Sequence, residues 1–433
     1  MFENKTLIIG GWLWALLTGL VLQIWVIPAT PWHAGHGLLA GGDWIQFQEQ
    51  ALRLAAAIEN AGWSAWELRF EGQAPASMAA AVYAVTGLSE PWVLLPLQGL
   101  LYGVAIWAAV DVARRIGVNE RLLWLVVLPF VVPSSLLIFG QIHKDILSLP
   151  GVLLIAWGWV MVLTDKTPKA RFWFHAAMAS VAGVLLVWWV RPYQAQLLLM
   201  TGFLIGIGAA ISAAAVRRWA AAAGPVLVLT VMMGTYGTAE KLTAPAAPAA
   251  PAAPAAPAAP AAAACATWQP EVTIPAIGGA AAALFCYRHH FIRHHPGEAA
   301  NIDHDRLLTN YGEAVRYLPR ALQIGLLAPF PTHWLGEASS PGGQVKRLLG
   351  GVEMLGFYVL LMGLIWAFRP VTNTWGVAAL SVIGIGGILF YAYSSPNVGA
   401  LYRYRFPFLM LLILIAALGW SNRLTATRSA QGV

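Results

Sequence analysis

Charged residues are scarce in this sequence. Asp, Glu, Lys and Arg together make up 10% of the 433 residues, whereas hydrophobic residues make up 59%. Soluble globular domains are about 25% charged and about 45–50% apolar. The scarcity of charge excludes an ordinary soluble protein, because the apolar excess has nowhere to face except lipid. We therefore expect the chain to cross a membrane many times.

Cysteine is almost absent, and only Cys265 and Cys286 occur. Both fall in or beside one predicted loop, so they could form a disulfide bond or remain free thiols, and their spacing does not decide which. A small-residue cleavage site is also lacking after the N-terminal Met-Phe-Glu-Asn-Lys. We expect the first apolar run to be retained as a membrane span.

Acidic residues are fewer than basic ones, which gives a net charge of +7. The basic residues are scattered among short loops, whereas nucleic-acid binding calls for a basic stripe along one element. Orientation in a membrane explains them better, because positive charge is retained on the cytoplasmic side. No nucleic-acid partner is expected.

Long apolar runs dominate the rest of the sequence and predict an all-α bundle of about ten transmembrane spans. Backbone amides in lipid have no water to bond, so each run must be helical, and none alternates as a barrel strand would. The runs begin near residues 6, 92, 122, 146, 172, 195, 219, 351, 374 and 405.

The short connections between these runs carry five basic groups that fall on one side of the membrane if ten spans alternate. They are Arg114 and Arg115; Lys166, Lys169 and Arg171; Arg217 and Arg218; Arg369; and Arg423 and Arg428. The positive-inside rule makes this side the cytoplasm, so both termini are predicted to be cytoplasmic. The long loops at 28–91 and 238–349 are then periplasmic.

Four segments follow from this layout. The N-terminal transmembrane module covers 1–237, including the first periplasmic loop at 28–91. An Ala/Pro-rich insert covers 238–270, where Pro recurs at every third residue and favours polyproline II without any catalytic side chain. A periplasmic loop with interfacial helices covers 271–349, before the eighth span. The C-terminal transmembrane module covers 350–433.

The first periplasmic loop contains an amphipathic pattern headed by Asp43. Apolar residues recur there at spacings of three and four, which predicts a helix. They are Trp44, Phe47, Ala51, Leu54 and Ile58. The helix could lie along the membrane surface or pack on neighbouring parts of the loop. Asp43 could cap its first turn, and it could also act as an outer-facing acid.

Cations stand at the outer ends of two spans in the N-terminal module. Lys144 follows the third span, where it could form a local pair with Asp145 or face an anionic lipid phosphate. Arg191 ends the fifth span beside two Trp residues. It could snorkel to the interface or bind the same phosphate.

The connection before the last span holds Tyr402, Arg403 and Arg405. Two Arg residues are costly beside apolar neighbours unless they meet an anion, and Arg can bond two phosphate oxygens at once. This is the strongest phosphate-binding candidate. In the large loop, Arg320 is a further candidate for binding substrate or phosphate, and it lies in a stretch of aromatic, Pro and basic residues that predicts an interfacial or re-entrant segment. The outer-facing polar groups could converge on one cavity, and Glu353 could cap the eighth span or face that cavity.

Histidine and acidic residues gather in one stretch of the large loop. They are His289, His290, His294 and His295, with Asp303, His304 and Asp305. The histidines lack the i, i+4 spacing of a shared metal, so we assign no metal ligand and no required cofactor. The alternative is Mg²⁺ or Mn²⁺ at the Asp303-His304-Asp305 motif, a DxD form that some sugar transferases use.

This layout resembles the GT-C superfamily of integral-membrane glycosyltransferases, which use polyprenyl-linked sugars. The resemblance is carried by Asp43 at the head of a surface helix and by the stretches GWSAWELRFEGQAP, PSS with HKD, LPRALQIGLLAPFP and PNVGALYRYRFP. It implies catalysis at the periplasmic face, with Asp43 as base on an acceptor hydroxyl. The charge on a leaving lipid phosphate would be stabilised by Lys144, Arg191, Arg403 or Arg405.

The expected function is transfer of sugars from a polyprenyl carrier during cell-surface polysaccharide biosynthesis in the bacterial inner membrane. The expected partners are the polyprenyl-linked donor, a glycan acceptor, membrane lipids and the polysaccharide synthesis machinery. A Wzy-like polymerase is the near alternative. A lipid-linked glycan flippase would carry broken helices and ionisable sites at mid-membrane, which the sequence does not display. A non-catalytic synthase subunit is the third alternative.

Overall fold

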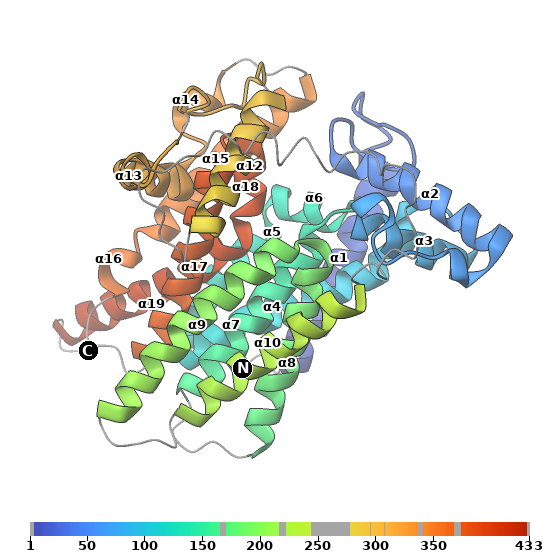
Figure 1. The fold of residues 1–433 in the computed structure, drawn as a ribbon. Helices are drawn as coiled ribbons and strands as arrows, with labels where there is room; N and C mark the ends of the chain where they lie inside the picture. Colours follow the sequence, from blue (N-terminus) through green and yellow to red (C-terminus); the bar gives the residue numbers. More distant parts are fainter. Residues whose placement is uncertain are drawn as a thin grey trace. The chain divides into compact units, whose positions relative to one another are not determined.

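The computed structural model describes residues 4–164, 170–215, 222–243, 278–294, 296–306, 308–336, 341–367 and 374–430. Within these ranges every regular element is a helix (Figure 1). The Ala/Pro stretch from 244 on, Cys265 and His295 lie outside them, as do the basic connections at 165–169, 216–221 and 368–373.

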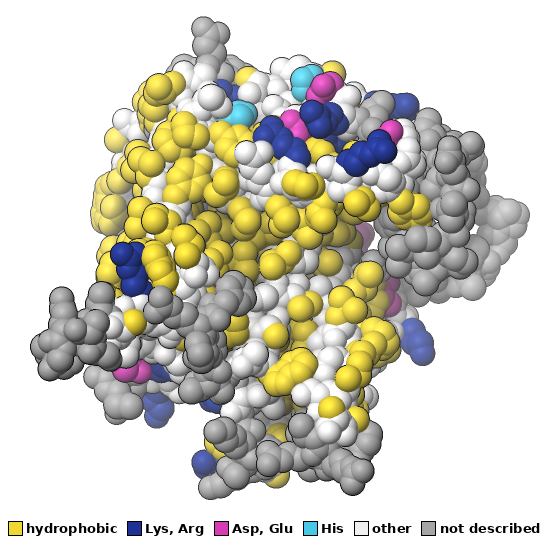
Figure 2. Space-filling model, turned by 90° about the vertical axis from the view of Figure 1, so that its left-hand side faces the viewer, with side chains coloured by type: hydrophobic (Ala, Val, Ile, Leu, Met, Phe, Trp, Pro, Cys, Tyr) yellow, Lys and Arg dark blue, Asp and Glu magenta, His cyan; other side chains and the backbone are white. Residues whose placement is uncertain are grey.

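Eight helical segments are long and apolar enough to span a membrane. They are Asn4–Val26, Pro91–Ile116, Asp145–Thr164, Ala170–Val190, Pro192–Ala215, Arg347–Ala367, Thr374–Ser394 and Phe406–Ala426. Figure 2 shows hydrophobic side chains over a broad area of one face, as lipid contact requires. The chain is an all-helical, multi-pass membrane protein.

Two of the ten predicted spans differ from expectation. The run near 122 forms Glu120–Val131 and Pro133–Phe139, which are bent by 62° and supply a ninth span only if they count as one. Pro133 causes this break, because it holds the preceding residue in extended backbone. The run near 219 forms the helix α10 (Ala223–Thr243), whose Thr, Gly, Glu and Lys residues leave it outside the candidate spans. The described residues thus supply eight or nine spans where the sequence predicted ten.

The chain forms two compact units, each described by itself here. Unit 1 comprises Met1–Ala239, Val359–Gly384 and Met410–Val433, and unit 2 comprises Glu240–Tyr358 and Ile385–Leu409. The residues from 350 on, which the sequence suggested as one module, contribute to both units.

Unit 1 is built on α1 (Asn4–Val21), α4 (Leu95–Ile116), α7 (Asp145–Thr164), α8 (Ala170–Val190) and α9 (Pro192–Ala215). Glycines let these helices approach closely, as in other membrane bundles. A Cβ atom at Gly103 would lie 2.2 Å from the carbonyl oxygen of Ile8, so α1 and α4 touch backbone to backbone. Gly151 and Gly183 play the same part between α7 and α8.

Short elements complete unit 1. They are the π-helix η1 (Leu22–Val26), the 3-10 helices η2 (Trp63–Ala65), η3 (Phe70–Gly72), η4 (Pro91–Leu94) and η5 (Glu120–Leu122), and the helices α5 (Trp124–Val131), α6 (Pro133–Phe139) and α16 (Leu364–Ala367). The last long helix, α19 (Phe406–Ala430), begins in unit 2 and continues in unit 1.

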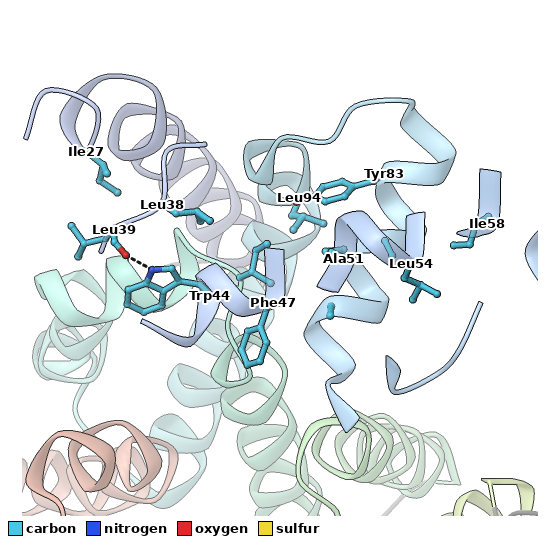
Figure 3. Packing of buried hydrophobic residues seen from close by; sticks show 14 residues of the cluster. Ile27, Leu38, Leu39, Trp44, Phe47, Ala51, Leu54, Ile58, Tyr83 and Leu94 are labelled. Carbon is cyan, nitrogen blue, oxygen red and sulfur yellow. Dashed lines mark hydrogen bonds between the residues drawn. The ribbon is translucent and has the colours of Figure 1, made fainter. Parts of the chain in front are cut away.

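The predicted amphipathic helix is α2 (Asp43–Ala61), and it lies beside α3 (Ala74–Thr86) (Figure 1). All five apolar residues of its pattern are buried, and they pack against Tyr83, Leu94 and the alanines of α3 (Figure 3). The apolar face of α2 is therefore covered by protein. Of the two alternatives, packing on neighbouring parts of the chain is confirmed and immersion of this face in lipid is wrong.

Unit 2 contains α12 (Gly278–His294), α13 (Tyr311–Leu327), α14 (Pro331–Trp334), most of α15 (Pro341–Leu361), the end of α17 (Thr374–Ser394) and α18 (Val398–Tyr404). A Cβ atom at Gly387 would lie 2.0 Å from the Phe408 ring, so α17 and the start of α19 pack tightly. Cys286, on α12, is disulfide-bonded.

Candidate functional site

The seven predicted site residues divide between the two units. Asp43, Lys144 and Arg191 belong to unit 1, whereas Arg320, Tyr402, Arg403 and Arg405 belong to unit 2. The expectation that all of them meet in one cavity stays a prediction, and each group is considered in its own unit.

In unit 1 the chain between α6 and α7 is not helical, so its buried carbonyl groups need other donors. Glutamine side chains supply them. The amide of Gln23, on the π-helix η1, donates to the carbonyl of Gly140 at 2.7 Å, and the amide of Gln98 donates to that of Gln141 at 3.2 Å. The side-chain oxygen of Gln141 in turn accepts a bond from the backbone N–H of Leu39 at 3.1 Å. These bonds fix the segment that leads to Lys144.

Arg191 is buried, and its guanidinium donates to the Asp145 carboxylate, which is 1% exposed. Nδ1 of His143 lies 3.0 Å from the other carboxylate oxygen. The snorkelling alternative for Arg191 is therefore wrong, as is a simple Lys144–Asp145 surface pair. Since Asp145 balances its charge, Arg191 offers little to a phosphate and acts chiefly in holding α7 to α8.

The first turn of α2 packs on this segment. The ring of Trp44 lies 6.0 Å from that of His143, and Nζ of Lys144 lies 5.6 Å from the ring centre of Phe47. Asp43 is exposed and is the first residue of the helix. The N-cap residue is Gly42, which has no side chain that could cap the helix. The capping role is thus wrong, although an acid in the first turn still suits the helix dipole.

Unit 1 therefore places the start of α2, which carries Asp43, beside the segment that carries Lys144, and the next residue, Asp145, is paired with Arg191. An exposed carboxylate can accept a proton from a hydroxyl, and an ammonium can stabilise a phosphate. Sequence reasoning missed Arg69, which donates to the carbonyls of Trp188 and Trp189 at 2.6 and 3.0 Å and so ties the first loop to the end of α8. The residues around Arg69 gave no sign of this contact, because its partners lie about 120 residues away in the sequence.

In unit 2, Arg405 is fully buried and bonded to backbone. Its guanidinium donates to the carbonyls of Ile324 at 3.1 Å, Gly325 at 2.6 Å and Ala328. These groups end α13, where carbonyls lack helical partners and the dipole favours a cation. Burial lowers the pKa of Arg405 to about 10. The predicted phosphate ligand is therefore a helix C-cap.

Tyr402 and Arg403 remain partly exposed. The Tyr402 hydroxyl donates to the Glu353 carboxylate at 2.5 Å, and its ring centre lies 5.6 Å from the Arg405 guanidinium carbon. Glu353 is buried within α15, not at its start, so the capping alternative is wrong for this residue too. Arg403 lies in the last turn of α18 and keeps its candidacy for phosphate.

Arg320 holds both oxygens of Asp303, at 3.0 and 3.1 Å, and the Tyr317 hydroxyl donates to the same carboxylate at 3.1 Å. Burial would raise the pKa of Asp303, but these bonds outweigh it and lower that pKa. Burial raises the pKa of Tyr317 to about 12. Arg288, another residue that sequence reasoning missed, is fully buried and donates to the Asp303 carbonyl at 2.7 Å.

This cluster argues against the DxD alternative, since Asp303 is already occupied by Arg320. Among the residues that the structure describes, no group of three His, Cys, Asp or Glu side chains could hold a metal ion. No protein-family model, curated protein or solved structure matches the chain.

Proposed function

We propose that this protein is an integral-membrane glycosyltransferase of the GT-C kind. It would act at the periplasmic face of the bacterial inner membrane on polyprenyl-linked sugars during cell-surface polysaccharide biosynthesis. One observation carries the proposal: Asp43 is an exposed carboxylate at the start of α2, and Trp44 and Phe47 of the same helix pack on His143 and Lys144. The multi-pass helical fold supports it, because a polyprenyl donor resides in lipid.

The proposed chemistry assigns one role to each residue. Asp43 takes the proton of the acceptor hydroxyl as its oxygen bonds to the anomeric carbon. The bond from that carbon to the phosphate oxygen breaks, and the phosphate leaves with the electron pair and is stabilised by Lys144. Arg403 is a separate phosphate-binding candidate within unit 2. Arg191 holds the Asp145 carboxylate and Arg405 holds backbone carbonyls of α13, and neither touches substrate.

The proposal is tested by complementing a deletion strain with Asp43→Asn and measuring lipid-linked glycans by mass spectrometry. Loss of a general base costs roughly 10²- to 10⁴-fold in rate, so glycan extension should fall below detection while protein level stays normal. Glu49→Gln is the matched control, since Glu49 is another exposed carboxylate on α2. Normal glycan in the Asp43→Asn strain would refute the mechanism.

The glycans that accumulate in the deletion strain separate the near alternatives. A truncated repeat unit indicates a sugar transferase, whereas complete single units on the carrier indicate a Wzy-like polymerase. Unaltered polymer in the deletion strain would exclude both.

One observation favours a flippase as the second candidate. The bent pair Glu120–Val131 and Pro133–Phe139 is a broken helix of the sort that transporters use around their substrates. A flippase would leave complete lipid-linked glycan on the cytoplasmic leaflet of the deletion strain. A periplasmic glycosidase added to spheroplasts would then fail to digest it, whereas the products of a blocked transferase would be digested.

A further inference from the structure

The buried carboxylate of Asp145, in unit 1, has two oxygens, and one of them faces a histidine. Arg191 donates to Oδ1. Nδ1 of His143 lies 3.0 Å from Oδ2, to which no other residue that the structure describes forms a hydrogen bond. His143 and Asp145 are 2% and 1% exposed, so water has little access to either side chain. Because a buried carboxylate oxygen without a donor is costly, His143 is the group placed to donate to Oδ2.

The same ring nitrogen faces a second group, which makes the contact depend on protonation. Nδ1 of His143 also lies 3.1 Å from the backbone nitrogen of Asp145. A neutral imidazole can carry its one proton on Nε2 and accept a bond from this N–H, or carry it on Nδ1 and donate to Oδ2. The protonated ring always donates to Oδ2, and a bond between an imidazolium and a carboxylate is roughly twice as strong as a neutral one. Protonation therefore selects the bond to Oδ2 and strengthens it.

The elements around His143 carry charges of both signs. The charged and titratable residues nearest to it along these elements are Asp43 at the start of α2, His33 and His36 in the first loop, Lys144 and Asp145 in the adjoining chain, and Arg191 before α9. Asp145 is in direct contact and favours the protonated ring, whereas the cations Lys144 and Arg191 oppose it. Opposing charges of this kind let the ring gain and lose its proton, whereas an acid alone would retain it.

Trp44 connects this pair to α2. Its ring lies 6.0 Å from that of His143, at the limit for attraction between a cation and an aromatic ring. The indole N–H donates to the carbonyl of Leu39 at 2.5 Å (Figure 3), and a Cβ atom at Gly42 would lie 2.2 Å from the indole ring. The ring is therefore fixed against the N-cap residue of α2, and the first turn of the helix moves with it.

We propose that His143 and Asp145 form a proton-binding site that holds the start of α2 in place. At low pH the imidazolium donates to Oδ2 and attracts the Trp44 ring, so the first turn of α2 is held on the segment before α7. As the pH rises, the ring releases its proton to water, Oδ2 loses its charged donor and the first turn loosens. This inference does not need the proposed glycosyltransferase activity, because stability and motion are measured and not glycan.

Thermal unfolding of the purified full-length protein between about pH 5 and about pH 8, where histidine ordinarily titrates, tests the site. Only the folded protein offers Oδ2 to the imidazolium, so folding favours the proton and the melting temperature should fall by several degrees as the pH rises. In His143→Asn the side-chain amide can donate to Oδ2 at every pH, so this fall should shrink. His304→Asn changes an exposed histidine of unit 2 and is the matched control, which should keep the fall of the unmodified protein.

A second measurement leaves His143 unchanged. A spin label on Gln46→Cys, in the first turn of α2, should become more mobile as the pH rises over the same range, whereas a label on Asn60→Cys, in the last turn, should not. Both changes replace exposed side chains, and the unmodified protein sets the labelling background. An equal fall of melting temperature in His143→Asn and the unmodified protein would overturn the inference. A label at position 46 whose mobility is the same at every pH would overturn it too.

Discussion

Buried charge in this protein is paired by contacts that reach far along the chain. Arg191 bonds to Asp145, and Arg405 bonds to the carbonyls that end α13. Both arginines stand immediately before a helix that begins at the next residue, so a local pattern suggests an exposed cation at the membrane edge. The folded protein instead buries both side chains. A buried charge must be compensated within the protein, so each arginine bonds to protein groups.

Arg191→Met should destabilise the protein strongly. It leaves the Asp145 carboxylate buried without its main partner, and breaking a buried ion pair costs about 3–5 kcal/mol. Thermal unfolding of the purified protein measures the effect. Arg53→Met is the control, because Arg53 pairs with Glu71 on the surface, and it should change little. Equal melting temperatures for the two variants would mean that Arg191 is free to bind a ligand after all.

Combining Arg191→Met with Asp145→Leu should cost less than the sum of the single changes, since neither buried charge is then left alone. Additive losses would show that the two side chains do not depend on each other.

At the scale of elements, α1 and α4 depend on a glycine contact that no larger residue can replace. In Gly103→Ala the new Cβ atom would lie 2.2 Å from the Ile8 carbonyl oxygen, a backbone atom that cannot swing aside. We expect a loss of about 1–3 kcal/mol in the free energy of unfolding, as for other overpacked sites, seen as a lower melting temperature.

Gly10→Ala is the matched control on α1, because nothing lies within 4 Å of its added Cβ atom. Ala is the better helix former by about 1 kcal/mol, so this variant should be as stable as the unmodified protein or more so. A stable Gly103→Ala protein would contradict the close packing of the two helices.

The helix α2 shows how far an element can be predicted. Its period of three and four residues gave its position and its apolar face, and both are confirmed. Periodicity reports that a face is apolar, but not whether lipid or protein covers it. Protein covers the apolar face of α2 because α3 packs beside it, and this neighbour is known only from the folded structure.

For the whole molecule, sidedness depends on whether α10 crosses the membrane. Its 21 residues extend about 31 Å, which is long enough. If α10 does not cross the membrane, the five basic groups cannot all lie on the cytoplasmic side. We expect α10 to cross, and Thr243→Cys, at its C-terminal end, should then react with a membrane-impermeant maleimide in intact spheroplasts.

Leu424→Cys should react only after the spheroplasts are permeabilised, because the C-terminus is then cytoplasmic, and Ser64→Cys should react in both cases. If Thr243→Cys also requires permeabilisation, α10 does not cross, and the orientation of the loop at 238–349 is reversed.

The sequence by itself determined that this is a helical multi-pass membrane protein and where most of its spans begin. Lipid enforces this, because each spanning segment must be apolar and satisfy its own backbone bonds, and both properties can be read from consecutive residues. Only the tertiary structure decided which charged side chains are buried in pairs within the protein and which are exposed. Asp145 neutralises Arg191 and α13 occupies Arg405, whereas Asp43 stays exposed. Such pairings join residues some 46 to 81 positions apart, and no local pattern records them.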